Sequence, residues 1–176
     1  MPAVPLADAE YAALTFAAHL VSFWETGRPE RWGWSYTLVD PLHAQIQAVG
    51  VSADGSVDNY CILLDARSYD EMPPGVYFVS PKNPQGPRPQ PGSRWLPSHS
   101  CVPFGFAIHQ TYNYPDGSMD QLVCFSQSRD YYISNHTPLP GEKWQPGAHT
   151  LAATLSRLHE VLSPPYYMGR AGALDT

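Results

Sequence analysis

Apolar residues recur at helical spacing near the start of the chain and predict a first helix over residues 7–25. Gly27 and Pro29 follow this segment, and we expect the helix to end there because both residues are poor helix formers. The apolar stripe consists of Tyr11, Leu14, Ala18 and Val21, widened by Phe16, Leu20, Phe23 and Trp24.

The next part of the chain alternates between apolar and polar positions, which is typical of half-buried strands. In one such run Ile46, Ala48 and Gly50 share a face, and Asp54-Gly55 after it is a turn signal. The pattern predicts an antiparallel meander of four strands, at residues 34–39, 43–52, 59–66 and 76–80.

Residues 81–97 carry six prolines and two glycines, so this segment cannot form a helix or a central strand. We interpret it as a surface loop. Residues 104–113 and 119–133 then predict a hairpin around the turn at residues 114–117, because both arms are rich in aromatic and β-branched residues. Residues 104–133 would be an insertion.

Four leucines at helical spacing predict the last helix, over residues 148–163, which Pro164-Pro165 ends. They are Leu151, Leu155, Leu158 and Leu162. The chain of 176 residues has the length of one domain. We expect residues 1–176 to form a single α+β domain, with both long helices on one side of the sheet.

Composition narrows the classes of partner. The chain has a net charge of −6 with only ten Lys and Arg residues and no basic cluster, which argues against nucleic acid. No apolar run reaches the roughly 18 residues of a membrane-spanning helix, and no secretory signal is visible. The three cysteines, Cys61, Cys101 and Cys124, fit neither a disulfide framework nor a zinc ribbon. A cytoplasmic protein with free thiols is expected.

Two motifs occur in a fixed order along the chain. Residues 69–78 read Tyr-Asp-Glu-Met-Pro-Pro-Gly-Val-Tyr-Phe, and residues 144–147 read Trp-Gln-Pro-Gly, shortly before Thr150-Leu151. They resemble Y-P-x-x-P-P-x-V-x-F and W-x-P with T-[LI] of the ubiquitin-conjugating-enzyme (UBC) family, with Asp70 in place of the first proline. The resemblance implies a UBC-like fold over roughly residues 8–165. We expect the consecutive prolines to bridge the third and fourth strands, with Tyr69, Val76 and Phe78 buried against the sheet.

The chain departs from this family where the family holds its catalytic cysteine, shortly before the tryptophan. That window contains Ser134, Asn135 and His136, and no H-P-N triplet is present. The segment resembles a bacterial branch of UBC-like proteins with S-x-H followed by W-x-P-G. Such proteins occur beside a ubiquitin-like protein, an activating enzyme and a metallopeptidase, which implies a similar setting and a role in antiviral defence.

Ser134 is the first candidate nucleophile, by its spacing to Trp144. His136 could act as its base or could orient an acyl carbonyl. The acyl group would then be held as an oxyester. The alternative is that Ser134 is only a turn residue.

Cys124 is the second candidate, because its hydrophobic context and the preceding Asp116-Gly117 turn are similar to those of the family's cysteine. A thiolate is the better nucleophile, but a small buried strand residue is the alternative interpretation. Cys101 is the third candidate, because it lies in the loop region where the family keeps its active site, with His99 close in sequence. The alternative is a loop thiol. Cys61 is expected in the core.

Polar residues of the second half could also act near an acyl carbonyl as donors or as a base, namely His109, Asn113 and Asp116. The spacing of His99, Cys101, His109, Cys124 and His136 fits no zinc pattern, so neither a metal nor another cofactor is expected.

Two classes of function remain open. The chain is either a transferase that passes the C-terminus of a ubiquitin-like protein from an activating enzyme to an amine of a target protein, or a UBC-like binding module without a nucleophile. Residues 81–97 could serve as a docking segment, although a plain surface loop is the simpler interpretation. A hydrolase that uses Cys101 or Cys124 with a histidine has no motif in its favour. Neither nucleic acid nor membrane is an expected partner.

Overall fold

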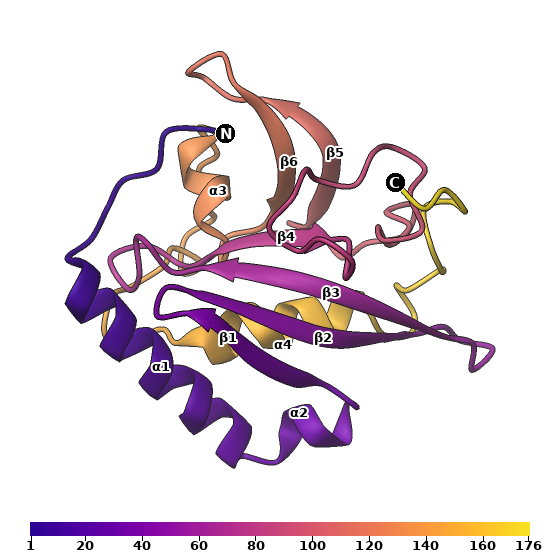
Figure 1. Cartoon of the computed structure of the whole chain (residues 1–176), viewed down its shortest axis with the longest axis horizontal. Helices are drawn as coiled ribbons and strands as arrows, with labels where there is room; N and C mark the ends of the chain where they lie inside the picture. Colours follow the sequence, from indigo (N-terminus) through magenta and orange to yellow (C-terminus); the bar gives the residue numbers. More distant parts are fainter.

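A four-stranded antiparallel sheet lies at the centre of the protein (Figure 1). The computed structural model describes residues 1–176, and the strands pair in the order in which they occur along the chain. The α+β class with four antiparallel strands is therefore confirmed. The strands are β1 (Ser35–Asp40), β2 (His43–Val51), β3 (Val57–Asp65) and β4 (Gly75–Val79).

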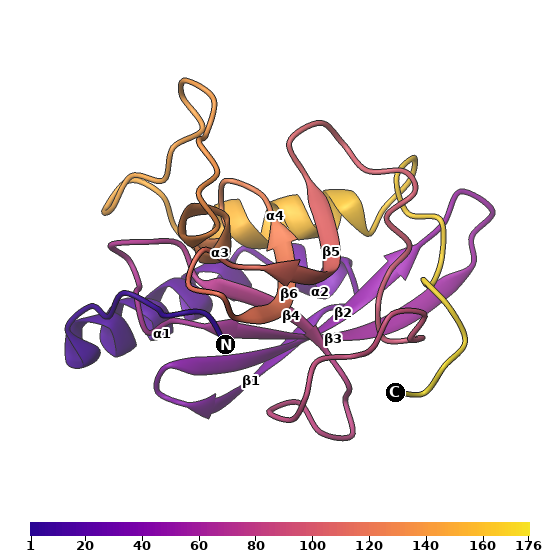
Figure 2. The same ribbon diagram turned by 90° about the horizontal axis from the view of Figure 1, so that it is seen from above.

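Two long helices pack on one face of this sheet, as expected (Figure 2). Helix α1 (Ala9–Glu25) begins at Asp8, whose carboxylate accepts the Tyr11 backbone N–H. Helix α4 (Leu151–Val161) begins at Thr150, whose hydroxyl caps it in the same way. The four leucines of the predicted last helix are fully buried, and so are Tyr69, Val76 and Phe78, as predicted.

The predicted buried stripe of α1 is wrong in part. All four residues of the central stripe are exposed: Tyr11, Leu14 and Val21 by 52%, 67% and 48%, and Ala18 as well. The face that packs on the sheet carries Ala12, Phe16, Leu20 and Phe23. Both sets of positions have helical spacing, so periodicity alone could not choose between them. The face with two phenylalanines removes more apolar surface from water and lies inside.

A short helix that the sequence did not predict follows the first one. Helix α2 (Arg28–Arg31) begins after Gly27, which has a left-handed φ of 67°. Pro29 is buried in its first turn. The Gly27-Pro29 pair therefore ends α1 as expected, but it also starts a second helical turn.

Residues 81–97 form a loop without helix or strand on the opposite face of the sheet, in agreement with the sequence (Figure 2). The hairpin after it consists of β5 (Ala107–Asn113) and β6 (Met119–Cys124). The predicted first arm is three residues too long, because Phe104 lies outside the strand and is 84% exposed. Gln121 of β6 joins the hairpin to the main sheet, since its amide accepts the Phe78 N–H at 2.8 Å and donates to the Phe78 carbonyl at 3.1 Å.

The predicted second arm of the hairpin is also too long. Strand β6 ends at Cys124, and residues 129–133 form helix α3 (Arg129–Ile133) instead. Local propensity favours a strand for Tyr-Tyr-Ile. The helix forms because Arg129 and Asp130 at its start are buried in ionic contacts, and the Arg129 N–H donates to the Pro74 carbonyl at 3.0 Å. None of the helices combines the length and the apolar character that crossing a membrane requires.

Candidate functional site

Ser134 stands at the C-terminal end of α3, where its backbone N–H donates to the Asp130 carbonyl at 3.1 Å. The Oγ atom of Ser134 lies 2.8 Å from the Nδ1 atom of His136. Asn135 between them has a left-handed φ of 62°, a conformation that asparagine tolerates better than most residues. This turn brings the two predicted site residues together.

Two aromatic side chains lie beside this Ser134–His136 pair. The ring of Tyr131 lies 5.1 Å from the ring of His136, and the ring of Tyr112 lies 6.2 Å from it. The hydroxyl of Tyr112 also donates to the Ser134 carbonyl at 3.4 Å. The hairpin and α3 therefore form one wall around the pair.

A second hydrogen bond competes for the Ser134 hydroxyl. Its Oγ lies 2.9 Å from the carbonyl oxygen of Tyr131, which can only accept. A serine has one proton to donate. If the proton goes to Tyr131, His136 must donate from Nδ1; if it goes to His136, Nδ1 is free to act as a base. Ser134 itself is only 4% exposed, so an acyl donor would reach Oγ only after a local movement.

Cys124 is placed poorly for nucleophilic chemistry. It is 6% exposed and packs with Tyr114 and Leu122. Burial raises the pKa of its thiol to about 11, so the thiolate is rare at neutral pH. The surroundings of Cys124 agree with the alternative interpretation, that it is a small buried strand residue. Cys61 is 1% exposed in β3, as expected for a core residue.

Cys101 is the one partly exposed thiol. Its Sγ lies 3.8 Å from the carbonyl oxygen of Pro165, at the far end of α4. Neither Ser134 nor His136 is among its contacts. The structure therefore does not bring Cys101 and the Ser134–His136 pair into one constellation.

We expect Cys101 to react with an alkylating agent before the other two thiols. Iodoacetamide at pH 7.5, followed by peptide mass spectrometry, should modify Cys101 at least about tenfold faster than Cys61 or Cys124, because the thiolate is the reactive form and burial suppresses it. In urea all three thiols should react at similar rates. Fast native labelling of Cys124 would contradict its burial.

The two sequence motifs meet at one place in the structure. The indole Nε1 of Trp144 donates to the Asp70 carbonyl at 2.7 Å, and the Gly147 N–H donates to the Asp70 carboxylate at 2.9 Å. Tyr11 of α1 donates to the same carboxylate at 3.2 Å. Asp70 is thus the residue that joins the two motifs to the first helix.

Tyr132 connects this junction to α3. Its hydroxyl accepts the Trp144 backbone N–H at 2.8 Å and donates to the Ser126 carbonyl at 2.9 Å. Both ends of the segment between Ser134 and Trp144 are therefore attached to the core. Residues 135–143 connect α3 to the Trp144 junction without helix or strand.

The remaining polar candidates separate into two groups. His109 lies near the site: burial lowers its pKa, and the charges of His136 and His99 lower it further. Asp116 caps the hairpin turn by accepting from Ser118, and Asn113 pairs with Met119 across the hairpin. Asp116 is therefore structural. No three His, Cys, Asp or Glu side chains converge in an arrangement that could hold a metal ion.

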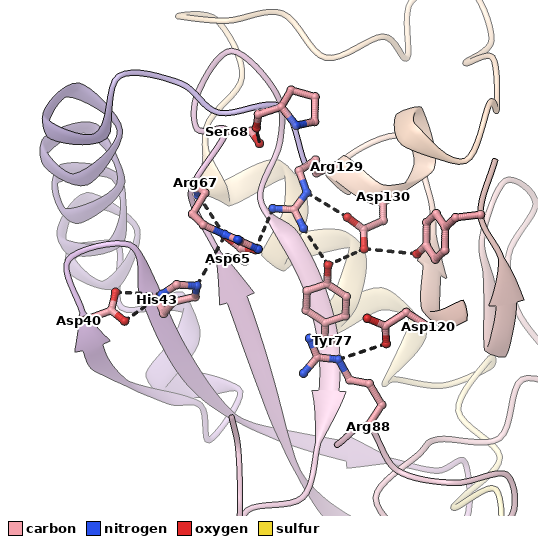
Figure 3. A network of polar contacts seen from close by, with 12 residues as sticks. Asp40, His43, Asp65, Arg67, Ser68, Tyr77, Arg88, Asp120, Arg129 and Asp130 are labelled. Atoms are coloured by element: carbon pink, nitrogen blue, oxygen red, sulfur yellow. Dashed lines mark hydrogen bonds and ion pairs between the residues drawn. The ribbon is translucent and has the colours of Figure 1, made fainter. Parts of the chain in front are cut away.

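A buried ionic network at the start of α3 was not expected from the sequence (Figure 3). Arg129 is fully buried and lies 2.9 Å from Asp65 and 3.0 Å from Asp130. Its Nη2 donates to the Tyr77 hydroxyl at 2.7 Å, which itself donates to Asp130 at 2.6 Å. Tyr114 contacts the same Asp130 oxygen at 3.4 Å. This network fixes the first turn of α3 against β3 and β4.

Asp65 at the edge of the network also binds Arg67 through both carboxylate oxygens. Burial alone would raise the pKa of Asp65, but the Arg67 hydrogen bonds and the charge of Arg129 hold it well below its usual range. Gly75 is required beside them, because a Cβ there would lie 2.6 Å from Arg129 Nη2. The sequence contains only a weak hint of this arrangement, in the spacing of Asp65, Arg67 and the Arg129-Asp130 pair. Charged residues so far apart in the sequence produce no periodic pattern.

Comparison of the chain with family models, with curated proteins and with solved structures finds no match. The site therefore has to be interpreted from its own geometry.

Proposed function

We propose that this chain is a UBC-like acyl carrier in which Ser134 holds the C-terminal acyl group of a bacterial ubiquitin-like protein as an oxyester. The observation that carries the proposal is the 2.8 Å contact between Ser134 Oγ and His136 Nδ1, since a serine nucleophile needs an adjacent base. The Asp70–Trp144 junction and the two helices on one face of a four-stranded meander support the same interpretation.

The chemistry has two balanced steps. Ser134 Oγ attacks the thioester carbonyl that an activating enzyme presents, its proton passes to His136 Nδ1, and the thiol leaves with that proton. A target amine then attacks the Ser134 ester, loses a proton to the same histidine, and releases the serine hydroxyl. The amine becomes an amide. Cys124 and Cys101 have no part in this scheme.

The direct test supplies the acyl donor chemically. The full chain is incubated with ubiquitin that carries a C-terminal mercaptoethanesulfonate thioester, and intact mass reports a covalent adduct. We expect an adduct that survives thiol at neutral pH and is cleaved by hydroxide. Ser134→Ala should abolish it, His136→Gln should slow it by about a hundredfold or more, and the exposed Ser100→Ala should leave it unchanged. An adduct that forms undiminished in Ser134→Ala contradicts the proposal.

A second candidate function is a binding module of the same fold without a nucleophile. The hydrogen bond from Ser134 to the Tyr131 carbonyl favours it, because it gives the hydroxyl a purely structural role. The two candidates require opposite tautomers of His136, which ¹⁵N spectra of the imidazole distinguish. An unprotonated Nδ1 supports the carrier. A protonated Nδ1, with no adduct but reversible binding of ubiquitin, supports the module.

A further inference from the structure

The sheet face opposite the helices carries a set of cavities that the Ser134–His136 pair does not use. Tyr77 of β4 points to this face, and the loop of residues 81–97 covers it. One cavity of about 250 Å³ lies between this loop and the sheet, lined by His43, Asp65, Arg67, Tyr77, Gln85 and Arg88 among others. Two neighbouring cavities, of about 300 and 260 Å³, also have Arg88 in their walls. Arg88 is thus the residue that the three cavities share.

The Arg88 guanidinium is held in place but poorly satisfied. Its central carbon lies 4.0 Å from the centroid of the Tyr77 ring, and its side chain is only 15% exposed. Its Nε is buried and has no hydrogen-bond partner. The nearest carboxylate oxygen belongs to Asp120 and lies 3.6 Å away, too far for a hydrogen bond. A buried donor without an acceptor is costly, but this Nε is closed to solvent, so a ligand in the cavities would meet the terminal nitrogens of the guanidinium.

The charges around the cavities limit what that ligand is. Arg67 is neutralised by its bidentate contact with Asp65, and Arg88 is balanced in part by Asp120. Met1, whose terminal amine is cationic, also lines two of the cavities, so the walls carry a slight excess of positive charge. A doubly charged anion would meet the two carboxylates, whereas a single negative charge spread over two oxygens matches the planar guanidinium.

From these contacts we infer that Arg88 binds a carboxylate group in the cleft between residues 81–97 and the sheet. The stacked Tyr77 ring fixes the plane of the guanidinium, so two parallel hydrogen bonds to one carboxylate can form without further ordering of the side chain. The cavity volumes admit a small acid or the last residues of a peptide. This inference does not depend on the acyl-carrier proposal, because none of the residues involved contacts Ser134.

The test is a titration of the ¹⁵N-labelled full chain, followed through the Nε–H signals of its arginines. The probes are sodium acetate and acetyl-Gly-Gly, with acetyl-Gly-Gly amide as the uncharged control. We expect a saturable shift of the Arg88 Nε–H signal with both carboxylates and none with the amide. Tighter binding of acetyl-Gly-Gly than of acetate would identify a peptide C-terminus as the source of the carboxylate, and equal binding would identify a small acid.

Arg88→Gln should raise the dissociation constant by about tenfold or more, because a charge-assisted bidentate contact is lost. Arg94→Gln is the matched control, since Arg94 lies over the Trp95 ring at 5.0 Å but is exposed. Arg88→Lys, which keeps the charge without the fork, should weaken binding while urea unfolding stays close to that of the parent chain. The inference is overturned if the amide binds as well as the acid, if both glutamine variants weaken binding equally, or if inorganic phosphate binds at Arg88 more tightly than acetate.

Discussion

Replacing Arg129 with methionine should lower the free energy of unfolding by about 3–5 kcal/mol. Arg129 is fully buried, and its removal leaves the carboxylates of Asp65 and Asp130 without the cation that lies within 3.0 Å of each. The substitution also removes the 2.7 Å hydrogen bond that Arg129 donates to the Tyr77 hydroxyl. Urea unfolding at pH 7, with equal slopes for both proteins, measures the difference.

The exposed Arg31→Met is the control, and it should change stability by less than about 0.5 kcal/mol. A triple variant that adds Asp65→Asn and Asp130→Asn removes the unpaired charges as well. It should be more stable than Arg129→Met alone if uncompensated charge causes the loss. If Arg129→Met unfolds at the same urea concentration as the control, the network does not hold α3 in place.

Acid should destabilise the protein through Asp65. Because the folded-state pKa of this carboxyl is held below its ordinary value of about 4, its contribution is fully present above that pH and is lost as the pH falls toward the folded pKa. We expect the stability difference between the parent chain and Asp65→Asn to shrink below pH 4, by up to about 1.4 kcal/mol per pH unit. Urea unfolding at half-unit steps from pH 6 to pH 2 measures it.

Glu25→Gln serves as the control for this series, because Glu25 is an exposed carboxyl at the end of α1. Its stability difference from the parent should change much less over the same range. A constant difference between the parent chain and Asp65→Asn from pH 6 to pH 2 would show that the Asp65 carboxylate gains nothing from Arg67 and Arg129.

The sequence could predict that Ser134 and His136 lie close together, but it could not predict which of the cysteines is accessible. The spacing to Trp144 located Ser134 and His136, and the structure places them in contact, because a two-residue separation leaves few conformations for the turn. The same reasoning could not rank the cysteines. Cys101 is partly exposed and Cys124 is buried. The exposure of a thiol depends on which segments of the folded chain pack over it, and no local sequence pattern contains that information.

The sequence by itself determined the elements whose signals are local. Proline and glycine ended the helices, alternation marked the four strands, and the leucines of α4 defined its buried face, since each of these depends on a few adjacent residues. Tertiary structure alone decided which side of α1 faces the sheet and that residues 129–133 are helical. Arg129 is buried only because Asp65 and Asp130 meet it from distant parts of the chain, and that balance of desolvation against pairing exists only once the chain has folded.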